Sequence, residues 1–130
     1  MNTYADYLNH PAGNILRMED ALKIYTEMCE SFSKCTMEDK MDFWNVFLEK
    51  AVKYTGIRYR WETMSREEKM AEDAGRSMVH DGLITAVNIL SRIAVKEGID
   101  NSWREELGDE RKRIGDFACF VTYMTGIANR

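Results

Sequence analysis

Residues 65–98 read SREEKMAEDAGRSMVHDGLITAVNILSRIAVKEG, and this stretch decides the fold. Ser65 and Glu68 have the spacing of a capping box, in which a hydroxyl and a carboxylate three residues later bind free backbone amides at a helix start. Gly98 is the residue type that best tolerates the left-handed turn at a helix end. The stretch therefore predicts one long central helix over about residues 66–97.

The second half of this helix, residues 78–95, is apolar on almost every side, so it is expected in the middle of a bundle or of an oligomer. One polar line crosses it at helical spacing: Asp81, Thr85, Asn88 and Arg92. Because an unpaired buried charge is costly, Arg92 needs a partner. The partner is Asp81 of a second, antiparallel copy, Asp116, or an anionic ligand; alternatively the line simply faces solvent.

Similar periodicity predicts three more main helices. The first begins after Asn14, and its apolar side carries Ile15, Met18, Leu22, Tyr25, Cys29 or Met28, Phe32 and Cys35. The second begins at a cap-like box, residues 36–39, and ends at Gly56, so that residues 57–61 form an irregular link or a short helix. Its apolar side carries Met41, Trp44, Phe47 or Leu48, Ala51 and Tyr54. The last begins after Asp109 and carries Ile114, Phe117, Phe120 or Val121, and Met124.

Short helices are expected over residues 4–8 and around 103–107. The fold class predicted is all-α: a single domain, residues 1–130, forming a compact bundle of four main helices with one or two short ones.

Composition narrows the class of protein. The chain has 130 residues, 18 basic and 22 acidic, and its net charge of −4 argues against binding to duplex nucleic acid. We expect no membrane span and no secretory signal, because no apolar run is long and clean enough and the N-terminus lacks a basic or apolar run. Three cysteines without a CxxC pair indicate reduced thiols and a cytoplasmic protein. No motif predicts a cofactor.

Two patterns would fit an enzyme. Adjacent His80 and Asp81 are reminiscent of metal-dependent phosphohydrolases of the HD type, but the only other histidine is His10. Carboxylates at three-residue spacing hold magnesium in all-α nucleotide pyrophosphohydrolases, and two pairs match that spacing: Glu27 with Glu30, and Glu106 with Asp109. With 22 acidic residues such matches arise by chance, and no metal site is predicted. A metal-dependent nucleotide hydrolase is therefore only the third hypothesis for function.

Cations beside aromatic residues indicate a site for an anionic ligand more clearly than the patterns above indicate an enzyme. Arg58 and Trp61 lie in one such segment, where arginine forks bind phosphate oxygens and aromatic faces stack on bases. Residues 103–119 contain another, with Arg111 and Arg113 next to a helical Gly115. That glycine costs about 1 kcal/mol relative to alanine, and close approach of another backbone or of a ligand would explain it. The alternative is ordinary helix–helix contact, with residues 111–113 in solvent and paired to Asp109 and Glu110.

The C-terminal half also resembles a known family. Trp61, Arg76, His80-Asp81, residues 88–92, Trp103-Arg104, residues 107–109, Arg111-Lys112 and residues 114–118 form a pattern similar to that of an uncharacterised family of small helical proteins from Gram-positive bacteria and their prophages. The resemblance implies no activity, cofactor or catalytic residue. It does imply a phage or mobile-element setting.

The first hypothesis for function is a non-enzymatic, oligomeric binding protein for a small anionic, nucleotide-like ligand. In a phage setting, this hypothesis takes the form of a sequestering or counter-defence protein that holds a host signalling nucleotide. The site predicted for it comprises Arg92, Asn88, Asp81, Arg111, Arg113, Arg58 and Trp61. The alternative is a protein–protein module that acts as inhibitor or adaptor on a host protein. In both cases the chain is expected to form a homodimer or a higher homo-oligomer.

Overall fold

The structure, a computed structural model, describes residues 15–61 and 63–125. This part of the chain is all helical, as predicted, with four main helices and one short one. Their bounds are α2 Met18–Lys34, α3 Lys40–Trp61, α4 Arg66–Lys96, α5 Ser102–Leu107 and α6 Arg111–Met124. The helix and turn expected over residues 4–14, with the cap at Asn14, lie outside the described residues.

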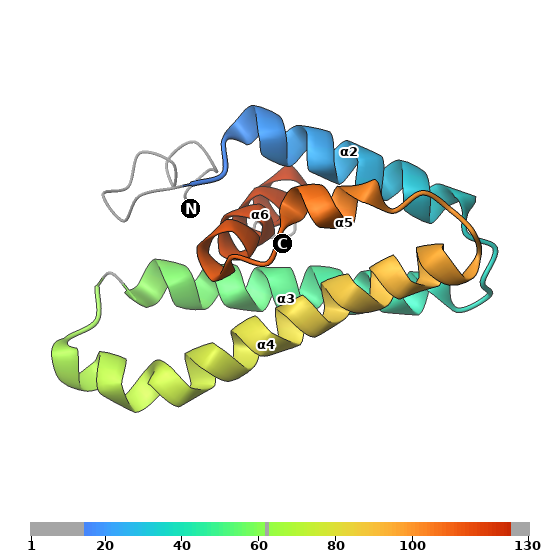
Figure 1. The fold of residues 1–130 in the computed structure, drawn as a ribbon. Helices are drawn as coiled ribbons and strands as arrows, with labels where there is room; N and C mark the ends of the chain where they lie inside the picture. The colour runs from blue at the N-terminus through green and yellow to red at the C-terminus, as the bar shows by residue number, and fades with distance from the viewer. Residues whose placement is uncertain (1–14, 62, 126–130) are drawn as a thin grey trace.

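Helices α3 and α4 form an antiparallel pair, and α2 and α5 lie together on the other side of the molecule, with α6 packed between the two pairs (Figure 1). Helix α6 is the most completely enclosed, since every residue from Ile114 to Thr122 is buried. The centre of the core is aromatic, and its largest fully buried side chains are Trp103, Phe47, Phe117 and Phe120. Burial of such large side chains supplies most of the favourable free energy of folding.

The capping signals of α4 are confirmed. The Ser65 side chain accepts a hydrogen bond from the Glu68 amide, and the Glu68 carboxylate accepts one from the Ser65 amide. At the other end Gly98 has φ +70°, and the next amide, of Ile99, donates to the Ala94 carbonyl at 2.9 Å. The capping box therefore sets the start of the helix at Arg66, and Gly98 sets its end at Lys96, close to the bounds that the sequence predicts.

We predict that Ser65→Ala lowers the free energy of unfolding by about 1 kcal/mol, the usual effect of losing an N-cap side chain. Chemical denaturation followed by circular dichroism measures it. Ser102→Ala is the matched control, because the Ser102 hydroxyl binds only an exposed carboxylate two residues before it. Equal stability of Ser65→Ala and the wild type would contradict the prediction.

The predicted end of α3 is wrong. Helix α3 continues through Gly56 to Trp61, and the expected link over residues 57–61 is its last turn. Ile57 is buried and Tyr59 packs edge-to-face against Tyr123, so tertiary packing outweighs the modest cost of a helical glycine. The predicted cap box at residues 36–39 does not form either, because the Thr36 hydroxyl donates to Glu97 at 2.8 Å.

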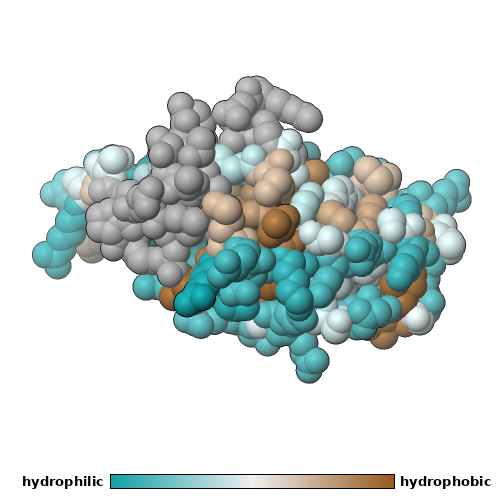
Figure 2. Space-filling view, turned by 90° about the horizontal axis from the view of Figure 1, so that it is seen from above, coloured by the Kyte–Doolittle hydropathy of each residue, from teal (hydrophilic) through white to brown (hydrophobic). Residues whose placement is uncertain are grey.

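The first turns of α2 are rotated relative to the prediction. Ile15, Met18 and Leu22 were expected in the core but are exposed, whereas Leu16, Ala21, Ile24, Met28 and Ser31 are buried. This buried row faces α5 and α6, against which α2 packs. Figure 2 shows apolar residues on the surface seen from above, among hydrophilic ones. Met41 and Met124, also expected in the core, are exposed as well, and α6 begins after Glu110 rather than Asp109.

One expectation about membranes also needs correction. By length and composition α4 is long and apolar enough to cross a bilayer. This is weak evidence, since the core helix of a soluble protein can pass the same test, and 39% of its most apolar window is buried inside the fold. In the described structure this helix packs against α3.

Candidate functional site

A pocket of about 350 Å³ opens where the end of α3, the first half of α4 and the start of α6 meet. Eight residues line it: Tyr54, Arg58, Trp61, Arg76, Ser77, His80, Arg111 and Lys112. Four of them are basic, two are aromatic, and none is acidic. In a chain of net charge −4, this concentration of positive charge is local and is not a consequence of overall composition.

Helical periodicity places these side chains together. Tyr54, Arg58 and Trp61 are four and three residues apart, so they share one face of α3 because that helix does not stop at Gly56. On α4, Arg76 and His80 are one turn apart on the face that turns toward α3. The remaining two, Arg111 and Lys112, are the first residues of α6.

A buried ion pair fixes Arg58 in the floor of the pocket. Its guanidinium lies 2.8 Å from Asp116 Oδ1, and the two side chains are 12% and 0% exposed. The other carboxylate oxygen, Oδ2, accepts hydrogen bonds from the amides of Ile15 and Leu16, at 2.7 and 3.0 Å. Asp116 was one of the partners suggested for Arg92, but it pairs with Arg58 instead. It thereby joins the segment before α2 to α3 and α6.

Gly115 makes room for this arrangement. A Cβ atom at this position would lie 2.6 Å from the Tyr54 hydroxyl and 2.8 Å from Arg58 Nη1, both shorter than a real Cβ contact. The close approach expected at this glycine therefore exists, and the approaching groups are two side chains of the pocket. Their positions depend on a missing methyl group on α6.

An aromatic and cationic wall forms the side of the pocket toward α4. The Arg76 guanidinium lies 4.4 Å from the centre of the Trp61 ring, a cation–π contact that holds both side chains. Burial raises the pKa of Tyr54, although the neighbouring Arg58 and Arg76 act in the opposite direction. Among the residues the structure describes, neither Arg76 nor Lys112 forms an ion pair with a carboxylate.

His80 contributes a hydrogen-bond acceptor. The side chain is buried, only 3% of the residue being exposed, and burial lowers its pKa, so the ring is neutral at pH 7. Nε2 lies 2.9 Å from the Arg111 carbonyl oxygen, which can only accept, and Nε2 therefore carries the hydrogen. Nδ1 is then an acceptor, and it is buried without a hydrogen-bond partner among the residues that the structure describes. An unsatisfied buried acceptor is costly unless a ligand completes it.

The start of α6 is electrostatically unusual. Its first three residues, 111–113, are basic, its first turn contains no acid, and the N-cap Glu110 makes no side-chain capping bond. Basic residues at this end oppose the helix dipole, which favours anions there. The one nearby acid that binds Arg111 is Asp81, at 3.2 Å, and both side chains of that pair are mostly exposed. An anion at the opening of the pocket would offset the repulsion between these basic residues and the positive end of α6.

The pocket contains some of the predicted site residues and not others. Arg58, Trp61 and Arg111 line it, and Asp81 adjoins it through Arg111. Asn88 instead accepts a hydrogen bond from Arg104, while Arg113 donates to the Leu107 and Glu106 carbonyls at the end of α5. Arg92 is exposed, beside a different groove, and sixteen residues along α4 from Arg76 place it about 24 Å away.

The carboxylates proposed for a metal are otherwise engaged. Glu27 and Glu106 do meet, because α2 packs on α5, but Lys23 lies within 3.2 and 2.9 Å of the two. The contact with Glu106 raises the pKa of Glu27, and Lys23 acts in the opposite direction and lowers the pKa of Glu106. Asp109 pairs with Arg104. Across residues 15–61 and 63–125 no three His, Cys, Asp or Glu side chains gather as metal ligands would.

The hypothesis of an HD-type metal site rests on His80, Asp81 and His10. The first two make other contacts in the structure, and the third is not described. His80 binds the Arg111 backbone and Asp81 binds the Arg111 side chain, so both serve the junction of α4 with α6. His10, the other histidine, lies outside the described residues.

Sequence reasoning did not assign Tyr54, Arg76, Ser77, His80 and Lys112 to the binding site. The signal that could have found the site is the shared helix face of Tyr54, Arg58 and Trp61. This face exists only if α3 continues past Gly56. The helical spacing of Arg76 and His80 is also visible in the sequence, where His80 fits either a metal ligand or a histidine hydrogen-bonded to a neighbouring polar group.

No protein-family model, curated protein or solved structure matches this chain.

Proposed function

We propose that this chain is a binding protein for a small phosphorylated, nucleotide-like ligand, which it holds in the pocket between α3, α4 and α6. The observation that carries the proposal is that the described residues of the lining include four basic and two aromatic side chains and no carboxylate. Guanidinium groups bind phosphate oxygens through two parallel hydrogen bonds, and aromatic rings provide surfaces for a base.

The polar groups of the pocket suggest which parts of the ligand they contact. Arg76, Arg111 and Lys112 stand around the opening and would hold the phosphate, together with the positive end of α6. His80 Nδ1 accepts a hydrogen bond, so it suits a ligand hydroxyl or a protonated phosphate oxygen. Nucleotides carry both phosphate and hydroxyl groups. Sequestration, in which the ligand is held without being converted, is the form of binding that we propose.

The test is isothermal titration calorimetry with pyrophosphate and with nucleoside mono- and diphosphates as probes. We expect the double variant Arg76→Gln/Lys112→Gln to raise the Kd for the best probe by at least about tenfold, because each charged hydrogen bond contributes about 1.5–3 kcal/mol. Arg66→Gln is the control for the general effect of losing a positive charge, since it removes one charge from an exposed position on α4 outside the pocket, whereas the double variant removes two charges within it.

Two results would contradict this function. One is that no probe binds at millimolar concentration at low salt. The other is that the double variant binds the best probe as tightly as Arg66→Gln does.

A further inference from the structure

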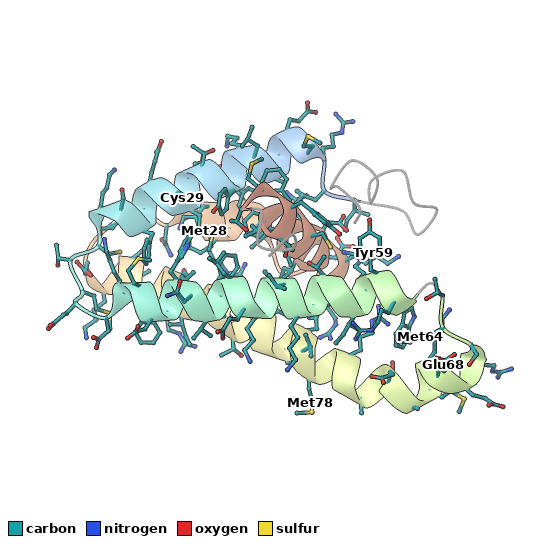
Figure 3. All side chains as sticks on the ribbon, turned by 180° about the vertical axis from the view of Figure 1, so that it is seen from behind. Met28, Cys29, Tyr59, Met64, Glu68 and Met78 are labelled. Atoms are coloured by element: carbon teal, nitrogen blue, oxygen red, sulfur yellow. The ribbon has the colours of Figure 1, made fainter. Side chains whose placement is uncertain are left out.

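One side of α4 is largely exposed, although Asn88 accepts a hydrogen bond from Arg104 of α5 and Asp81 contacts Arg111 of α6. Its exposed positions recur at alternating spacings of three and four residues: Met78, Asp81, Thr85, Asn88, Arg92 and Val95, here named the outer stripe. Met78 and Val95 are 75% and 62% exposed, and Asn88 alone is half-buried. Figure 3 shows Met78 pointing away from the rest of the fold. This spacing is the one that packs two helices together along a shared seam.

The outer stripe is also symmetric in its chemistry. About the midpoint between residues 86 and 87, Met78 and Val95 are equally distant, and so are Asp81 and Arg92, and Thr85 and Asn88. If a second α4 ran antiparallel across the first, each apolar residue would meet an apolar one and each acid a base. The central hydroxyl would likewise meet an amide. A two-fold axis requires this kind of self-complementarity.

We propose that the outer stripe is a homodimer interface, in which the α4 helices of two copies pack antiparallel with Asp81 of each opposite Arg92 of the other. Arg92 is exposed, and no carboxylate pairs with it among the described residues. Among the described residues, Asp81 is bound only by an exposed, 3.2 Å contact to Arg111, so it can bind a second cation. Two symmetric ion pairs then flank the centre of the interface.

Next to the outer stripe there is room for a partner's side chains. A groove of about 520 Å³, lined by Met37, Ile89, Ile93 and others, opens beside Arg92. Its lining is more apolar than that of the ligand pocket, as an interface core is. An unrelated partner would have no reason to match the symmetry of the outer stripe, and a bilayer would leave Asp81 and Arg92 in hydrocarbon. The second copy is therefore the occupant that the residues favour.

Exchange of the two charges tests this proposal. In sedimentation equilibrium the wild type is expected at twice its 15.2 kDa mass. Asp81→Arg and Arg92→Asp each place like charges opposite each other and should weaken dimerisation by at least about tenfold. The double variant Asp81→Arg/Arg92→Asp restores opposite charges and should dimerise like the wild type. Because it also lacks the Asp81–Arg111 contact, its recovery separates the interface from that contact.

A disulfide experiment tests the register. Met78→Cys and Val95→Cys proteins, mixed and mildly oxidised, should form a disulfide-linked heterodimer, while either variant alone should not exceed the background of the wild type with its three native thiols. A wild type that remains monomeric at high concentration would overturn the proposal, including the case in which it binds some other protein. A double variant that stays monomeric, or equal crosslinking of all mixtures, would also overturn it.

Discussion

Asp116→Ala is expected to lower the free energy of unfolding by about 3–5 kcal/mol, the range found when one partner of a buried ion pair is removed. The substitution leaves the Arg58 guanidinium, 12% exposed, without its carboxylate at 2.8 Å. It also removes the acceptor for the Ile15 and Leu16 amides. Because a domain of this size is stable by only about 5–15 kcal/mol, urea denaturation should show a large shift of the midpoint.

Asp109→Ala is the matched control for this prediction. Asp109 also pairs with an arginine, Arg104, and at 2.7 Å the contact is slightly shorter than the buried one. Its side chain is 93% exposed, however, so water replaces the lost partner and we expect a change below about 1 kcal/mol. Similar losses for the two variants would show that the Asp116 pair is not desolvated as the structure describes.

Gly115→Ala is expected to destabilise the protein by about 1–3 kcal/mol, the usual penalty for inserting a methyl group into a packed site. The new Cβ would lie 2.6 Å from the Tyr54 hydroxyl and 2.8 Å from Arg58 Nη1. Neither group can yield easily, because Tyr54 is buried and Arg58 is held by Asp116. Thermal denaturation gives the change in stability, and the same variant should bind the best phosphate probe more weakly because two lining residues are displaced.

Gly75→Ala is the opposite case in the same protein. Gly75 is an exposed glycine inside α4, and the nearest atom to its missing Cβ is Glu72 Oε2 at 3.9 Å. The higher helix propensity of alanine should then stabilise the protein by up to about 1 kcal/mol. If both variants shifted stability in the same direction, the close contacts at Gly115 would not be the cause of its effect.

The parts of the fold that could be predicted are those whose signals are local. The Ser65–Glu68 box and Gly98 act within a single turn, so the bounds of α4 were accessible from sequence. The end of α3 was not, because the gain that carries the helix past Gly56 comes from the packing of Ile57 and Tyr59. For α2 the apolar residues cover a broad sector, and which part turns inward depends on α5 and α6, far away in sequence.

The candidate site shows the same division. Arg58, Trp61 and Arg111 could be picked out because guanidinium and indole groups suit an anionic, aromatic ligand wherever they meet. That they meet each other, and not Arg92 or Arg113, depends on how α3, α4 and α6 pack, which no short spacing encodes. Arg113 has a chemically similar side chain and a neighbouring position, yet it caps the carbonyl end of α5.

The double role of the Asp116 carboxylate provides an internal reporter for the pocket. It holds Arg58 through one oxygen and the amide hydrogens of Ile15 and Leu16 through the other. Under the proposed function, a ligand that draws the guanidinium toward itself should weaken the hydrogen bonds to those two amides, and their hydrogen–deuterium exchange should then be faster in its presence. The two amides just before α2 would thus report binding without any label on the ligand.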